Sequence, residues 1–79
     1  MTVIRIVTAT HFDQPGTKVF AHKTAGGARR RAFELVSQML IASKLEFQAS
    51  DVTWTRGLEH LNNSGRECDV SIATVEIEP

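Results

Sequence analysis

The sequence predicts a single α+β domain over residues 1–79. We expect a three-stranded, mainly antiparallel sheet with one long and one shorter helix on one face, in the order β-β-α-α-β. β-branched residues cluster near both ends of the chain, and a run of apolar residues with helical period lies between them. A chain of 79 residues can build one core but not two.

The first two strands form a predicted hairpin. Residues 3–10, VIRIVTAT, carry apolar side chains at both even and odd positions, which is typical of a strand near the sheet centre with both faces covered or nearly so. Pro15-Gly16 is a strong turn signal. Residues 17–23, TKVFAHK, are therefore expected to pair back onto the first strand.

The long helix is expected over residues 25–43. Its apolar side chains recur at intervals typical of one helical face: Ala28, Ala32, Leu35, Val36 and Met39. Thr24 is a suitable N-cap, because its hydroxyl can accept a hydrogen bond from an amide of the first turn.

A second, shorter helix is favoured over residues 51–62. Ser50 is a possible cap, Trp54 and Leu58 lie one turn apart, and Asn62 to Gly65 would end the helix. Trp54 is expected to anchor this helix against the core. A strand remains the alternative, since DVTWT has strand composition and glycine weakens a helix interior.

The closing strand, ECDVSIATVEIE at residues 67–78, has an unusual phase. Cys68, Val70 and Ile72 share one parity, whereas Val75 and Ile77 share the other. Either a bulge near residues 73–74 resets the register, or the two halves of the strand bury opposite faces.

Charge is unevenly distributed, although the formal net charge is zero. Residues 1–40 hold six cationic and two anionic side chains, a balance of +4, whereas residues 41–79 hold three and seven, a balance of −4. A dedicated DNA-binding domain is usually basic overall. No apolar run approaches the roughly 20 residues of a membrane span, and the N-terminus lacks a signal-peptide pattern. A cytoplasmic protein without a membrane partner is therefore expected.

The segment TAGGARRRAFEL, residues 24–35, is a candidate anion-binding site. A helix N-terminus favours anions, and guanidinium groups suit phosphate or carboxylate. Three consecutive residues span about 200° of a helix, so Arg29, Arg30 and Arg31 cannot all face one ligand. The alternative is a set of solvated arginines, with Arg30 paired to Glu34. The stretch lacks the Gly-Lys-Ser/Thr of a P-loop.

Other groups of polar residues give little support for metal binding or catalysis. His11, Asp13 and His22 could meet at the open end of the hairpin, but they lack metal-binding spacing. Cys68 and Ser64 are not in nucleophile turns, and Cys68 is expected to be a small buried hydrophobe within the last strand. We expect no metal, no cofactor and no enzymatic activity.

In its size, its opening strand VIRIVTAT, its capped helix TAGGARRRAFELVSQML and its closing strand CDVSIATVEIE, the chain resembles small accessory proteins of bacteriophages, and among those the anti-CRISPR inhibitors. The resemblance implies a stoichiometric inhibitor that acts in the host cytoplasm. It would bind a CRISPR–Cas effector complex and block DNA binding or nuclease recruitment. The zero net charge favours direct steric blocking over DNA mimicry.

Two charged surfaces are candidates for contact with a larger protein complex: the basic start of the long helix and the acidic closing strand. Their candidate residues are Lys23, Arg29, Arg30, Arg31, Glu67, Asp69 and Glu76. An apolar face involving Val3, Val7, Val75 and Ile77 could also stay open and pair with a partner or a second copy, so a monomer or a homodimer is expected. The alternative function is a small nucleic-acid-binding regulator that uses residues 29–31 on phosphates.

Overall fold

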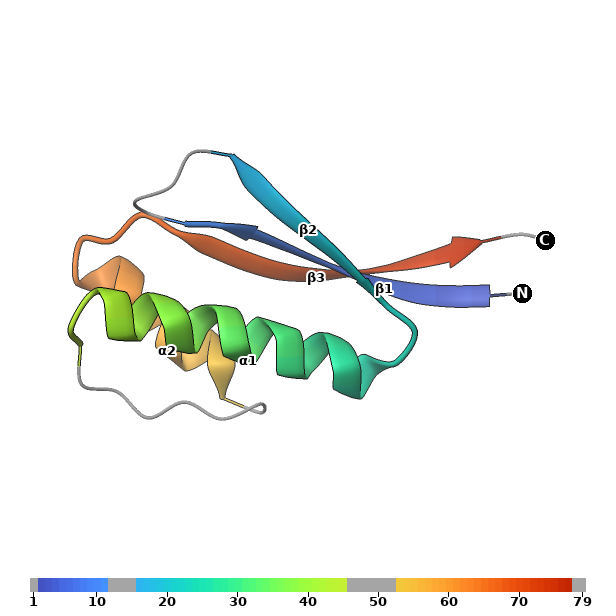
Figure 1. Cartoon of the computed structure of the whole chain (residues 1–79), viewed down its shortest axis with the longest axis horizontal. Coiled ribbons are helices and arrows are strands. Elements are labelled where there is room, and N and C mark those ends of the chain that lie inside the picture. The colour runs from blue at the N-terminus through green and yellow to red at the C-terminus, as the bar shows by residue number, and fades with distance from the viewer. Residues whose placement is uncertain (1, 12–15, 46–52, 78–79) are drawn as a thin grey trace.

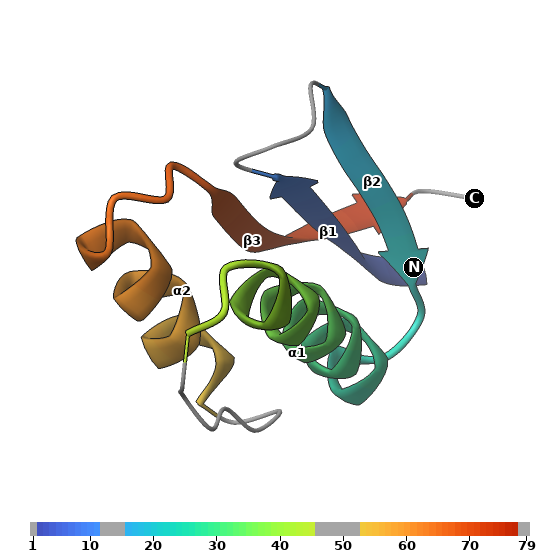
Figure 2. The same cartoon turned by 60° about the vertical axis from the view of Figure 1, so that its left-hand side comes forward.

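The computed structural model describes residues 2–11, 16–45 and 53–77. Two antiparallel neighbours flank the central strand, so the sheet order is β2-β1-β3. Both helices lie on one face of this sheet (Figures 1 and 2). The elements are β1 (Thr2–Thr10), β2 (Thr17–His22), α1 (Ala25–Ala42), α2 (Trp54–Asn63) and β3 (Asp69–Ile77). The predicted α+β class and its β-β-α-α-β order are confirmed.

The pairing of β3 with β1 shows how the apolar residues of β3 are divided between the two faces of the sheet. β1 and β3 pair without interruption from Thr2 opposite Ile77 to Thr10 opposite Asp69, so no bulge resets the strand. Alternation along this regular ladder places Val70 on the helix-covered face and Ile77 on the opposite face. The bulge alternative is therefore wrong, and the two halves of β3 do turn apolar residues to opposite faces, but Val75 and Ile77 are exposed there and not buried.

The core lies between one face of the sheet and α1, and α2 closes one side of it. Its buried members are Val7, Ala9, Ala28, Ala32, Val36, Met39, Leu40, Leu61 and Val70. The predicted stripe of α1 is present, with Leu35 half-buried and Leu40 more deeply placed. The expected anchor Trp54 packs against this core together with Leu58. One face of the sheet and the two helices thus supply the buried hydrophobic residues of the described chain, and Leu45 and Cys68 pack against them from outside these elements.

Residues 54–63 are helical, so the favoured interpretation of this segment is confirmed. Ser50 and Asp51 lie outside the described residues, and Thr53 occupies the N-cap position, where its side chain does not cap the helix. The helix ends at Ser64, and Gly65 follows with a φ of 85°, a left-handed conformation that glycine adopts without steric penalty.

Within residues 2–11, 16–45 and 53–77, no layer covers the second face of the central strand. Val7 and Ala9 are buried beneath the helices, whereas Ile4 and Ile6 lie at the opposite parity. The expectation that both faces of this strand are covered is therefore wrong for a single chain, because both helices lie on the same side (Figure 2). The open face also differs from the expected one, since Val7 belongs to the core.

Candidate functional site

The start of α1 is a well-formed N-cap. The Oγ1 of Thr24 accepts a hydrogen bond from the N–H of Gly27 at 3.0 Å, and its carbonyl accepts from Ala28 at 3.1 Å. A Cβ at Gly27 would stand 3.0 Å from that Oγ1 and 3.4 Å from the Nδ1 of His22. Gly27 is thus explained by close packing, and the cap occupies one of the amides that an anion would otherwise use.

Arg31 connects α1 to the sheet. Its guanidinium carbon lies 4.5 Å from the centroid of the Phe20 ring, which is a cation–π distance. Its Nε donates to the Nε2 of His22 at 3.4 Å, and its Nη1 lies 3.7 Å from the Oε2 of Glu34. The expected pairing of Glu34 with Arg30 is therefore replaced by one with Arg31. These contacts make Arg31 a packing residue.

The other two arginines face outward. Arg29 and Arg30 are exposed, and Lys23 is exposed just before the helix. The Nη2 of Arg29 lies 4.0 Å from a Cβ built at Gly26, so this guanidinium folds back towards the helix start. Two of the three consecutive arginines therefore remain available to a ligand, as the rotation per residue predicts.

Arg5 reaches the same end of the molecule from β1. Its Nη1 donates to the carbonyl oxygen of Lys23 at 3.1 Å. We call Arg5, Lys23, Arg29 and Arg30 the basic end. Sequence reasoning missed Arg5, although the hairpin register supplies the signal, because Arg5 stands opposite His22, the last residue of β2.

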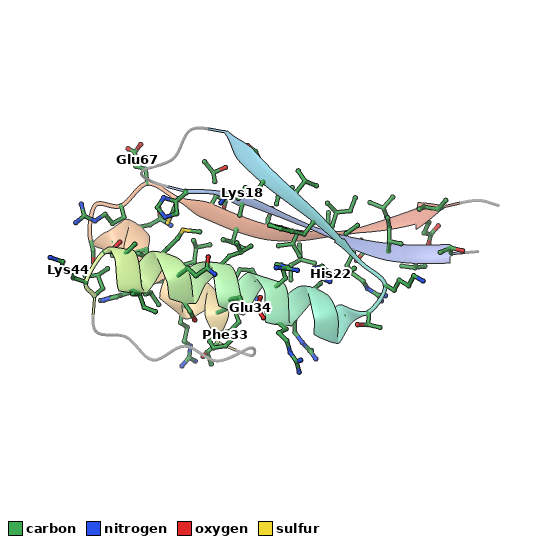
Figure 3. The ribbon with its side chains drawn as sticks, viewed as in Figure 1. Lys18, His22, Phe33, Glu34, Lys44 and Glu67 are labelled. Atoms are coloured by element: carbon green, nitrogen blue, oxygen red, sulfur yellow. The ribbon has the colours of Figure 1, made fainter. Side chains whose placement is uncertain are left out.

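The acidic candidates do not form one surface. Asp69 begins β3 and Glu76 lies seven residues later, so they are on opposite faces and about 23 Å apart at 3.3 Å per residue. Glu67 precedes the strand at the end of the molecule away from the start of α1 (Figure 3). Glu76 stands opposite Val3, diagonally across from Arg5. Only the basic candidates are concentrated in space.

The histidines considered for a metal site are far apart. Thr10 pairs with Thr17 beside the hairpin loop, whereas His22 pairs with Arg5 at the other end of β2. His11 therefore lies about six strand residues, or roughly 20 Å, from His22. Asp13 lies outside the described residues. Over ranges 2–11, 16–45 and 53–77, no group of three His, Cys, Asp or Glu side chains could hold a metal ion.

Cys68 lies immediately before β3 and not within it, and it is half-buried against the core. Its amide donates to the Oδ1 of Asn62 at 3.3 Å, which joins the end of α2 to the last strand. Burial, and secondarily the charge of Asp69, raises the pKa of the thiol. A protonated thiol is a poor nucleophile, so the site favours a packing role for Cys68.

Comparison with protein-family models, curated proteins and solved structures finds no match to the chain. Among the helices of the described residues, none is both long enough and apolar enough to cross a membrane. The basic end is therefore the feature on which a functional proposal rests.

Proposed function

We propose that this chain is a small, non-catalytic protein-binding domain that inhibits a larger complex by occupying one of its docking surfaces through the basic end. The observation that carries the proposal is the gathering of exposed cationic side chains at the start of α1, while Arg31 is held by packing contacts. Guanidinium groups form two-point hydrogen bonds with carboxylates, so the fitting target is an acidic protein patch.

Several features favour a protein target over nucleic acid. Three exposed cations, Lys23, Arg29 and Arg30, would neutralise about three phosphates, which gives only weak binding at physiological salt. Base stacking needs accessible aromatic rings on a sheet. The ring of Phe20 lies under Arg31, and Trp54 packs against the core. The nucleic-acid alternative thus has little support beyond charge.

The whole-chain resemblance to anti-CRISPR inhibitors makes a CRISPR–Cas effector complex the partner that we propose. The channel that holds nucleic acid in such a complex is positively charged. The basic end is better suited to an acidic surface that recruits another protein, such as a nuclease. In this proposal the domain acts by steric exclusion and performs no chemistry.

The test is the affinity of candidate CRISPR–Cas effector complexes for the wild-type protein and two charge-reversed variants, measured by biolayer interferometry. Arg29→Glu with Arg30→Glu should weaken binding by at least about tenfold, or 1.4 kcal/mol. The matched control is Lys44→Glu with Arg56→Glu, which makes the same charge change at exposed sites. Lys44 follows the far end of α1 (Figure 3), and Arg56 lies on α2. The control should stay within about threefold of wild type. Equal losses in both variants, or none in either, would refute docking through the basic end.

Fluorescence anisotropy with labelled duplex and single-stranded oligonucleotides distinguishes this proposal from the alternative of a nucleic-acid-binding regulator. The proposal predicts no binding at physiological salt. Salt-sensitive binding that disappears in Arg29→Ala/Arg30→Ala, with a log–log slope near −3, would instead support a nucleic-acid-binding regulator.

A further inference from the structure

The sheet face away from the helices carries an apolar patch that no other element of the described residues covers. Alternation along the three paired strands places seven apolar residues on this face: Ile4, Ile6, Val19, Ala21, Ala73, Val75 and Ile77. We call it the open face. Val19, Ile77 and Val75 are 61%, 44% and 37% exposed, which is high for branched apolar side chains on a sheet.

Polar residues of the open face gather mainly at the hairpin-loop end of the sheet: Thr8, Thr10, Thr17, Asp69 and Ser71, with Thr2 at the other end. Thr8 and Ser71 stand opposite each other, and their hydroxyl oxygens lie 2.7 Å apart in a hydrogen bond. This pair can lose water without leaving both hydroxyls unpaired. Among the described residues of the face, Asp69 is the only charged one, and it lies at the end of the ladder. The face can therefore be buried with little penalty from charge.

The apolar residues form continuous rows across the strands. Ile6 lies between Ala21 and Ala73, and Ile4 lies opposite Val75. These rows continue into the part of β1 and β3 that extends past the start of α1 (Figure 1). A layer that covers these apolar residues must therefore extend from the Ile77 end of the sheet to the row of Val19. A second sheet of equal length meets that requirement.

We propose that a second copy of this chain covers the open face, so that two three-stranded sheets pack face to face about a two-fold axis. A two-fold axis across the strands places Asp69 of each copy near the Ile77 end of the other, so like charges are not opposed. Two such sheets would align at about −30°, as in β-sandwiches. The central strand would then be covered on both faces, in agreement with its apolar residues at both parities.

The area of the open face that two copies would bury is in the range of a weak, specific dimer interface. Nine residues at about 3.3 Å and three strands at about 4.8 Å give a flat footprint of roughly 400 Å² per copy. Two facing copies bury roughly 800 Å² in projection. Side chains that stand out from the sheet raise the accessible area towards the roughly 1,000–1,200 Å² at the lower end of specific interfaces. A dissociation constant in the micromolar range is expected.

Sedimentation velocity of the full chain between about 1 and 200 µM tests the proposal, because this range brackets a micromolar constant. Wild type should shift from monomer to dimer. Val75→Lys, and separately Val19→Lys, should raise the dissociation constant by at least about tenfold, since each places an unpaired charge in the interface. Ile41→Lys is the matched control: Ile41 is 77% exposed on the outer side of α1, and its variant should dimerise as wild type does.

Circular dichroism verifies that each variant is folded, and two variants on different edge strands guard against the failure of one. A wild-type protein that stays monomeric throughout the range would overturn the proposal. So would a dimer that Ile41→Lys disrupts, or one that both folded sheet variants retain. The last result would indicate pairing along a strand edge instead. The basic end is unchanged in these variants, so the dimer and the docking function are tested separately.

Discussion

Replacing Arg31 with alanine should destabilise the fold, whereas the same change at Arg29 or Arg30 should not. All three arginines are adjacent in sequence, but only Arg31 lies over Phe20 and contacts His22 and Glu34. The three arginines are chemically identical, so the expected difference in stability between their alanine variants comes from their contacts alone.

The magnitude follows from the contacts that are lost. A partly exposed cation–π contact contributes about 0.5–1 kcal/mol, and a hydrogen bond as long as 3.4 Å contributes about 0.5 kcal/mol. The ion pair to Glu34 is partly exposed and spans 3.7 Å, so it adds only about 0.3 kcal/mol. The higher helix propensity of alanine adds about 0.2 kcal/mol to the unfolding free energy of the variant. The net loss in unfolding free energy is about 1–1.5 kcal/mol, or roughly 5–10 °C in Tm for this size.

Urea denaturation monitored by circular dichroism measures the effect. Arg29→Ala and Arg30→Ala should each stay within about 0.5 kcal/mol of wild type. A double-mutant cycle of Arg31→Ala with Phe20→Leu should give a coupling energy of about 0.5 kcal/mol or more, because leucine keeps apolar volume but removes the ring. If Arg31→Ala matched the Arg29 variant, or the coupling were absent, the assignment of Arg31 to packing would be refuted.

Four further changes probe local features. Thr24→Ala should lower the unfolding free energy by about 1 kcal/mol while Thr24→Ser keeps most of it, because serine retains a hydroxyl that can accept from the N–H of Gly27 and alanine does not. Thermal melts that rank the two variants alike would contradict this. Gly26→Ala should stabilise α1 by about 0.5 kcal/mol, but Gly27→Ala should give no gain, since its Cβ would crowd Thr24; an equal gain in denaturant midpoint would count against the packing argument. Leu61→Ala should cost about 2–4 kcal/mol in chemical denaturation, because this side chain is fully buried between α2 and the core; a loss below about 1 kcal/mol would indicate a looser core. Cys68 should react with a thiol reagent more slowly at neutral pH than it does in urea, and its rate should rise only in more alkaline solution, because its pKa is raised in the fold; equal rates would contradict the burial of the thiol.

Much of the fold could be predicted from short-range patterns. The N-cap at Thr24 and the stripe of α1 depend on residues within four positions of one another, and both are observed. The element order follows from the same kind of signal. The candidate site was only partly predictable, since the sequence places residues 29–31 together but does not reveal that Phe20 lies beneath one of them.

The sequence by itself determined the elements of this protein, because helix period, strand alternation and capping act over a few residues. It also determined that the three consecutive arginines on α1 cannot all face one ligand, since helix geometry fixes the rotation per residue. Only the tertiary structure decided which arginine packs on β2, that Arg5 joins Lys23, and that Asp69 and Glu76 lie on opposite faces. Only it decided that the helices share one side and leave Ile4 and Ile6 uncovered. Strand register and layer placement are set by contacts between distant segments, and no local pattern encodes them.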